Sequence, residues 1–196
     1  MDRRKKKSIQ VINYLASKSP NSKINRLKLM KLLWLADRYH LLRYGRTILK
    51  DSYFAMEHGP VPTVTLNLSK HIDDYTNEYL IFTRYSIESK MSPDLTFFSE
   101  TDINVLDKVL RDFEIYNQWD LCDISHEYPE WKRFEQALND PTTPNSYSME
   151  MVDFFMIPKD NGKNFSSFFE ISEEIIFESK QIFHSRKRFE LNSSKR

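Results

Sequence analysis

Apolar residues recur three or four positions apart along several stretches of this chain, which is the pattern of amphipathic helices. In one stretch Gly45 marks the end, because glycine favours the left-handed C-cap conformation, and Asn21 or Ser22 is expected to serve as the N-cap. Ser99 and Asp102 form a capping box, with aspartate in place of the usual glutamate, before another regular stretch. Together these patterns predict helices over residues 5–18, 24–44, 99–113, 117–126, 129–138, 148–155 and 172–188.

Strand-like patterns occupy the middle of the chain. Residues 51–58 alternate between two sides as a half-buried strand does. Residues 79–87 favour strand because they are rich in aromatic and β-branched residues, and residues 95–98 follow a Ser-Pro-Asp turn. Residues 59–62 read Gly-Pro-Val-Pro, so they are expected to end the first strand and to open a helix over residues 61–71. The three strands together predict a small antiparallel sheet.

These elements indicate an α+β fold class, predominantly α-helical, with a small antiparallel β element and a C-terminal helix. The best candidate for a linker is the run Asp160-Asn161-Gly162. We therefore expect one domain at residues 1–158 and a C-terminal helical extension at residues 163–196. The apolar face of the last helix is expected to dock on its own domain, and a homodimer through this helix is the alternative.

The helix predicted over residues 24–44 carries several charged residues. On a helical wheel Lys28, Lys31 and Arg38 fall on one stripe, while apolar residues occupy most of the remainder. The stripe is expected to face outward, either into solvent or toward an acidic partner. Asp37 falls among apolar side chains, where a carboxylate without a partner is costly. It is therefore expected to bond to His40 or to a neighbouring backbone amide.

The composition indicates a chain that folds without cross-links. Hydrophobic residues make up 40% of it, and 14 Phe, 10 Tyr and 3 Trp supply area for a core. Trp34, Trp119 and Trp131 are interpreted as core anchors, and an exposed one would be a candidate hot spot. The single Cys122 excludes an intramolecular disulfide and favours a reducing compartment. Because we recognise no secretion signal and no apolar run near ~20 residues, we expect a cytoplasmic protein with no membrane segment.

Basic residues gather at the two ends of the chain, although its formal charge is only +1. Five stand in a row from Arg3 to Lys7. Terminal runs of this kind are usually solvated tails. A DNA-associated regulator that uses the basic termini is an alternative function, but nucleic acid is not a favoured partner because no aromatic-interleaved basic stripe supports it. The second cluster consists of Arg186, Lys187, Arg188, Lys195 and Arg196.

The motifs give little support to catalysis. Asp37, His40, His58, His126 and Glu127 are the polar residues that could converge on a metal or acid–base site, but no two of these histidines have the H-x-x-x-H spacing common in zinc sites. No G-x-S-x-G elbow surrounds a serine, and three glycines do not build a phosphate loop. We therefore predict that the chain is not an enzyme and carries no cofactor. A His-based metal-dependent enzyme is the least favoured alternative.

Two blocks of sequence are similar to the motifs of a known family. The first block reads KLMKLLW at residues 28–34 and FAMEHGPV at residues 54–61. The second reads LCDISHE at residues 121–127 and continues to Pro129 and Trp131. In the order and spacing of these motifs, the chain resembles the Panacea or SocA-like antitoxin domain family, most strongly over residues 26–137.

The resemblance implies an α-rich domain with a small β element, found in bacteria and phages, which neutralises a cognate toxin by direct contact. This chain departs from the family pattern in two places: Ser125 stands where threonine is usual, and Glu130 separates the proline from the tryptophan. The Gly59-Pro60 corner also has a simpler interpretation as a backbone bend. The candidate protein-binding residues are Lys28, Lys31, Arg38, His58, Gly59 and Pro60, and the candidate structural polar residues are Asp37, His40, His126 and Trp131.

Overall fold

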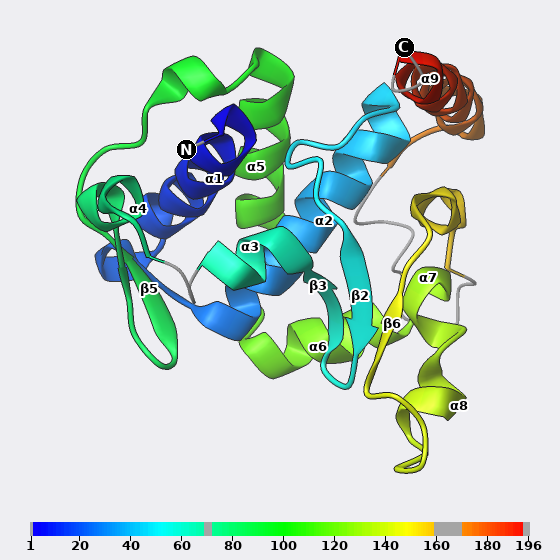
Figure 1. The fold of residues 1–196 in the computed structure, drawn as a ribbon, viewed down its shortest axis with the longest axis horizontal. Helices are drawn as coiled ribbons and strands as arrows, with labels where there is room; N and C mark the ends of the chain where they lie inside the picture. The colour runs from blue at the N-terminus through cyan, green and yellow to red at the C-terminus, as the bar shows by residue number, and fades with distance from the viewer. Residues whose placement is uncertain (1, 69–71, 159–169, 194–196) are drawn as a thin grey trace.

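A computed structural model describes residues 2–68, 72–158 and 170–193 of the chain. One long helix, α2 (Arg26–Tyr44), crosses the middle of the molecule, and the other elements pack around it (Figure 1). The fold is α+β and mainly helical, as the sequence predicts. Within the described residues, no helix is long and apolar enough to cross a membrane.

The ends of α2 follow from local capping chemistry. Gly45 adopts the predicted left-handed C-cap conformation, with φ 63°. The N-cap is Asn25, whose side-chain oxygen accepts from the amides of Leu27 at 2.9 Å and Lys28 at 3.1 Å. The predicted N-caps, Asn21 and Ser22, are wrong. They lie in a short 3-10 turn with positive φ, and strand β1 separates that turn from α2.

Most of the predicted helices are confirmed. The capping box before α5 is present: the Asp102 amide donates to Ser99 Oγ at 3.2 Å, and the Ser99 amide donates to the Asp102 carboxylate at 3.1 Å. Asn117 caps α6 in the same manner. The helices around α2 are α1 (Arg3–Lys18), α3 (Thr63–Leu68), α4 (Asp74–Tyr79), α5 (Glu100–Phe113), α6 (Gln118–His126), α7 (Pro129–Lys132) and α8 (Glu135–Leu138).

The strands form two three-stranded antiparallel sheets rather than one. The single strand predicted over residues 79–87 is wrong: the segment folds back on itself as two strands that pair with each other, Leu80–Phe82 and Ser86–Ser89. The predicted strand at residues 51–58 lies in the other sheet, where it pairs with two short segments that carry no strand signal of their own. The first sheet has the order β1 (Lys23–Asn25), β5 (Ser86–Ser89), β4 (Leu80–Phe82), and the second has the order β3 (Gly59–Pro62), β2 (Tyr53–Met56), β6 (Ser146–Ser148).

Several local predictions are wrong for identifiable reasons. Gly59–Pro62 continues the sheet as β3, because an edge strand tolerates prolines that have no amide hydrogen to donate. Leu95–Phe97 is a 3-10 turn in which the Asp94 side chain accepts from the Thr96 amide, instead of a strand. The helix predicted over residues 129–138 is broken at Phe134, whose ring stacks on Tyr147 at 5.3 Å.

The predicted helix at residues 148–155 is also replaced, by strand β6 and the 3-10 helix η3 (Met151–Phe155). In this segment Phe155 is buried and faces the last helix, α9 (Glu173–Ser193). The candidate linker at residues 160–162 lies outside the described residues, so the boundary between the two predicted parts stays a prediction.

The apolar face of α9 packs on its own domain, as predicted. A Cβ atom placed on Gly45, at the end of α2, would lie 2.5 Å from the Ser179 carbonyl oxygen and 2.8 Å from the Ile182 side chain. The rings of Phe155 and Phe183 have centroids 5.6 Å apart. Glycine at the end of α2 therefore does two things: it permits the left-handed cap, and it lets α9 approach (Figure 1).

Candidate functional site

Two of the three basic residues predicted to form an outward stripe on α2 are buried. Lys31 is 0% and Arg38 is 1% exposed, while Lys28 is half-buried. The prediction of an outward stripe is therefore wrong for Lys31 and Arg38. The physical reason is that other elements cover α2 on nearly every side, so each of its polar groups must find a partner inside the protein.

Arg38 finds its partners in the second motif block and beyond it. Its Nε donates to Glu130 Oε1 at 2.8 Å, and its guanidinium carbon lies 4.6 Å from the centroid of the Tyr128 ring. A terminal nitrogen also donates to the Met156 carbonyl. Burial raises the pKa of Glu130, and the charge of Arg38 opposes that rise. Arg38 is thus an interior tie between α2 and the chain that follows α6.

Lys31 reaches the hairpin of β2 and β3. Its Nζ donates to the Pro60 carbonyl at 2.9 Å, and burial lowers the pKa of this ammonium group to about 7. Gly59 has φ +96°, and a Cβ atom there would lie 2.1 Å from Ser125 Oγ and 2.8 Å from Lys31 Nζ. We call the meeting point of Lys31, Gly59, Pro60 and Ser125 the Gly59 corner.

The second motif block supports the other strand of the hairpin. Trp131 Nε1 donates to the Met56 carbonyl at 2.8 Å, and the His126 ring stacks on the Trp131 ring with centroids 3.7 Å apart. Burial and the charge of Lys31 lower the pKa of His126. The two motif blocks, which lie far apart in the sequence, therefore converge on one hairpin. The buried groups at this corner hold the backbone in place and present no reactive side chain to solvent.

We expect Gly59→Ala to lower the free energy of unfolding by at least about 2 kcal/mol, because the substitution combines a strained positive φ with two close contacts. Urea unfolding of the two proteins measures the loss. Adding Ser125→Ala removes the nearer contact, so the double variant should be more stable than the sum of the two single effects. A Gly59→Ala protein as stable as the wild type would contradict the crowding at this corner.

Large side chains are exposed at the turn of the β2–β3 hairpin, on α6 and in the turn before α6. Trp119 is 55% exposed, and its ring meets His58 edge-on with centroids 5.5 Å apart. Ile115, in the turn before α6, is 83% exposed. Lys28 fixes this turn, because its Nζ donates to the carbonyls on both sides of Ile115, those of Glu114 at 2.8 Å and Tyr116 at 2.7 Å. We call His58, Ile115 and Trp119 the Trp119 face.

The structure divides the predicted site residues by exposure. His58 is exposed, Lys28 lies beneath the neighbouring turn, and Lys31, Arg38, Gly59 and Pro60 are interior. Trp34 and Trp131 are core residues as predicted, but the same interpretation is wrong for Trp119. Ile115 was missed by sequence reasoning, since an isolated isoleucine before a helix carries no signal of exposure.

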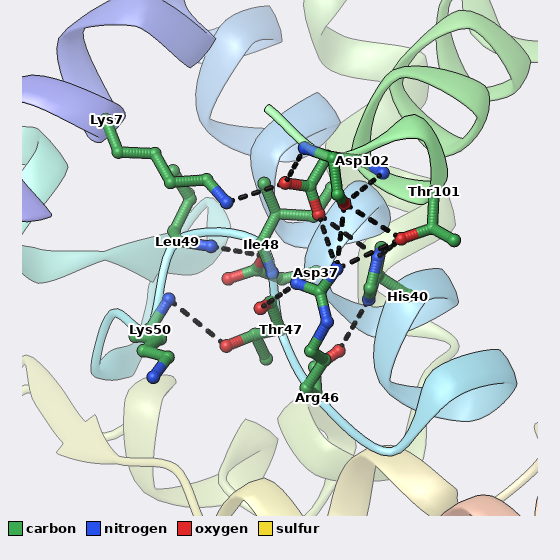
Figure 2. Close-up of polar contacts among 11 residues, drawn as sticks. Lys7, Asp37, His40, Arg46, Thr47, Ile48, Leu49, Lys50, Thr101 and Asp102 are labelled. Carbon is green, nitrogen blue, oxygen red and sulfur yellow. Dashed lines mark hydrogen bonds and ion pairs between the residues drawn. The ribbon is translucent and has the colours of Figure 1, made fainter. Parts of the chain in front are cut away.

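Asp37 and His40 are both buried but do not pair with each other (Figure 2). The amides of Ile48 and Leu49 donate to Asp37 Oδ1 at 2.7 and 3.0 Å, and the Tyr53 hydroxyl donates to Oδ2 at 2.9 Å. The predicted bond to a backbone amide is therefore confirmed, and the predicted Asp37–His40 pair is wrong. Burial raises the pKa of Asp37 to about 7, although these three hydrogen bonds oppose the rise.

His40 belongs to a second polar group, centred on Asp102 of α5 (Figure 2). Its Nδ1 lies 2.8 Å from the Arg46 carbonyl and its Nε2 lies 3.2 Å from Asp102. The same carboxylate meets Lys7 at 2.6 Å and Arg46 at 3.0 Å. Burial alone would raise the pKa of Asp102, but hydrogen bonds from His40, Lys7 and the Ser99 amide hold it well below its usual range. This group ties α1, α2 and α5 together.

In the parts of the chain that the structure describes, no group of three or more His, Cys, Asp or Glu side chains is placed to hold a metal ion. No curated protein and no solved structure matches the chain. A family model described as "Antitoxin SocA-like, Panacea domain" matches residues 29–132, more than half of the chain, and this range holds Lys31, the Gly59 corner and Trp131. The chain therefore belongs to the SocA-like antitoxin family with a Panacea domain.

Proposed function

We propose that this chain is an antitoxin-like interaction module that neutralises a cognate toxin by binding it directly through the Trp119 face. Membership of the family supports an antitoxin-type role. The observation that carries the choice of surface is Trp119, a large aromatic side chain left 55% exposed within the matched range. Tryptophan is among the residues most enriched in binding hot spots.

The Trp119 face is held in shape before any partner arrives. Asn117 caps α6 by accepting from the amides of Trp119 at 2.8 Å and Asp120 at 3.2 Å. Lys28 bonds to the two carbonyls that flank Ile115, and the Gly59 corner fixes the strand that follows His58. A surface that is already ordered loses less conformational entropy on binding, so more of its interaction free energy appears as binding affinity.

We expect Trp119→Ala to weaken toxin binding by about 30-fold or more, the effect of losing a hot-spot side chain. Co-expression with each gene next to its own identifies the toxin by rescue of growth and by co-purification. Calorimetric titration of the purified pair then measures the affinity. Phe177→Ala is the matched control, since Phe177 is a similarly exposed aromatic residue, 64% exposed, on α9.

The outcomes of this test distinguish an error in the proposed antitoxin role from an error in the choice of the Trp119 face as the binding surface. If no adjacent gene product binds or is neutralised, the antitoxin role is wrong for this chain. Equal losses for Trp119→Ala and Phe177→Ala, or no loss for either, would move the interface away from the Trp119 face. Thermal unfolding of each variant should match the wild type, because both side chains are largely outside the core.

The structure gives little support to the alternative function, a DNA-associated regulator that uses the basic termini. The basic run at Arg3–Lys7 lies in helix α1 rather than in a tail. Lys7 pairs with the buried Asp102, and Lys6 lies 4.8 Å from the centroid of the Tyr75 ring. Part of this charge therefore already serves the domain's own packing, so we do not propose DNA binding.

A further inference from the structure

A pocket of about 440 Å³ lies between the loop that follows α2, the end of β6 and helix α9. It brings together basic side chains from three distant parts of the sequence: Arg4 from α1, Lys50 from the loop, and Arg186 and Lys187 from α9. The sequence places these residues in an N-terminal run, a central segment and a C-terminal cluster. The fold is what makes them neighbours.

The lining of the pocket carries an excess of positive charge. Its basic side chains are Arg4, Arg46, Lys50, Arg186 and Lys187, and its acidic ones are Asp51, Glu150 and Glu190. Arg46 is already paired with Asp102 at 3.0 Å, whereas the other four basic groups form no ion pair within the described residues.

The acidic side chain deepest in this lining is already occupied. Asp51 accepts from the amides of Ser52 at 2.7 Å, Val64 at 2.9 Å and Thr65 at 3.0 Å, and also from the Thr65 hydroxyl at 2.8 Å. It therefore serves the start of α3 and offers little to neutralise the cations around it. Four basic groups therefore face only two other carboxylates, those of Glu150 and Glu190, and the excess of positive charge can attract an external anion.

Lys50 is held where it is by the buried centre of the domain. Its backbone has φ +53°, a conformation that residues other than glycine rarely adopt, and its amide donates to Thr47 Oγ1 at 3.1 Å (Figure 2). The two residues before it are anchored by Asp37, which accepts from both of their amides. Backbone strain that a structure maintains in this way is often found at binding sites.

The rest of the lining favours a peptide over a nucleic acid. Leu41, Met151 and Phe183 give the pocket apolar walls next to its basic groups. A DNA backbone is contacted by a row of cations along an open surface, whereas the cations here gather around one pocket. An acidic peptide that also carries an apolar side chain matches both parts of the lining.

We propose that this pocket binds an acidic peptide segment of the partner protein, with aspartate or glutamate carboxylates meeting Lys50, Arg186 and Lys187 and an adjacent apolar side chain resting against Phe183. The inference rests on the proposed function only in naming the partner, and it uses a surface separate from the Trp119 face. Helix α9 lies outside the range that the family model matches, so part of this pocket lies outside the family domain.

The test uses the full chain and two short dye-labelled peptides, one alternating glutamate with leucine and the other alternating glutamine with leucine. We expect the glutamate peptide to bind about tenfold more tightly than the glutamine peptide, and its affinity to fall as salt is added. The double variant Arg186→Glu with Lys187→Glu should weaken it about tenfold, because both exposed side chains line the pocket. Arg188→Glu, which reverses one charge instead of two, is the control on the same helix, outside the lining.

Each other result overturns the proposal. Equal binding of the two peptides would show that charge is not recognised, and equal loss with Arg188→Glu would show that the whole helix attracts anions. A labelled duplex DNA that binds as tightly as the glutamate peptide, and loses affinity with the same double variant, would make this a nucleic-acid site. Trp119→Ala should leave peptide binding unchanged, so failure of the toxin assay and failure of this one are distinguishable.

Discussion

Arg38→Ala is expected to lower the free energy of unfolding by about 3–5 kcal/mol, the usual cost of removing one partner from a buried ion pair. The guanidinium group is 1% exposed and its partner Glu130 is 0% exposed. Without Arg38, the Glu130 carboxylate would stay buried with no opposing charge, and the Met156 carbonyl would lose its donor. Urea unfolding at neutral pH, followed by circular dichroism, measures the change.

Two controls isolate the ion pair from simple loss of volume. Replacing both partners, in the double variant Arg38→Met with Glu130→Leu, should restore most of the stability because no buried charge is left uncompensated. Lys108→Ala removes a more exposed pair with Asp112, 2.7 Å apart, and should cost less than about 1 kcal/mol. If Arg38→Ala cost no more than Lys108→Ala, the guanidinium group could not be the interior tie that its contacts indicate.

The helical wheel of α2 shows what sequence reasoning could and could not predict. Its apolar positions correctly indicate a central helix, and Gly45 correctly marks its end. The wheel failed for Lys31 and Arg38, because it ranks the faces of one helix but contains no information about what covers them. The partners that make their burial tolerable, the Pro60 carbonyl and Glu130, lie 29 and 92 residues away.

Signals within a few residues of each other were reliable, and pairings between distant segments were not. The Ser99–Asp102 capping box was predicted because all of its atoms lie within one turn of helix. Strand β3 was missed because its prolines argue against a strand unless the segment is at an edge, which depends on its partners. The exposed Trp119 was missed for a related reason: burial is the usual fate of tryptophan, and a binding surface is an exception that composition does not reveal.

Lys31→Met is expected to change the pH dependence of stability more than any other single substitution. The pKa of Lys31 is lowered by burial from 10.5 to about 7, so this group contributes most stability above pH 10.5 and loses that contribution as pH falls toward about 7. In that window the unfolded chain binds a proton that the folded chain does not. The wild type should therefore lose about 1.4 kcal/mol per pH unit relative to Lys31→Met as the pH falls.

Urea unfolding of both proteins across this pH window gives the difference directly, and titrations common to both chains cancel. Lys28→Met is the matched comparison: burial also lowers the pKa of Lys28, but its ammonium is only half-buried and donates to two carbonyls, so its slope should have the same sign and be smaller. Parallel stability curves for the wild type and Lys31→Met would mean that Lys31 keeps its proton when folded.

Asp37→Asn is expected to reveal the opposite pH dependence of stability. Burial raises the pKa of Asp37 from 3.8 to about 7, so its contribution to stability is fully present below pH 3.8 and is lost as pH rises toward about 7. Relative to Asp37→Asn, the wild type should lose stability from acid toward neutral pH, whereas relative to Lys31→Met it should lose stability from alkaline toward neutral pH. Two buried groups on one helix therefore each make their smallest contribution near neutral pH, which is expected if both serve to fix the loop and hairpin rather than to maximise stability.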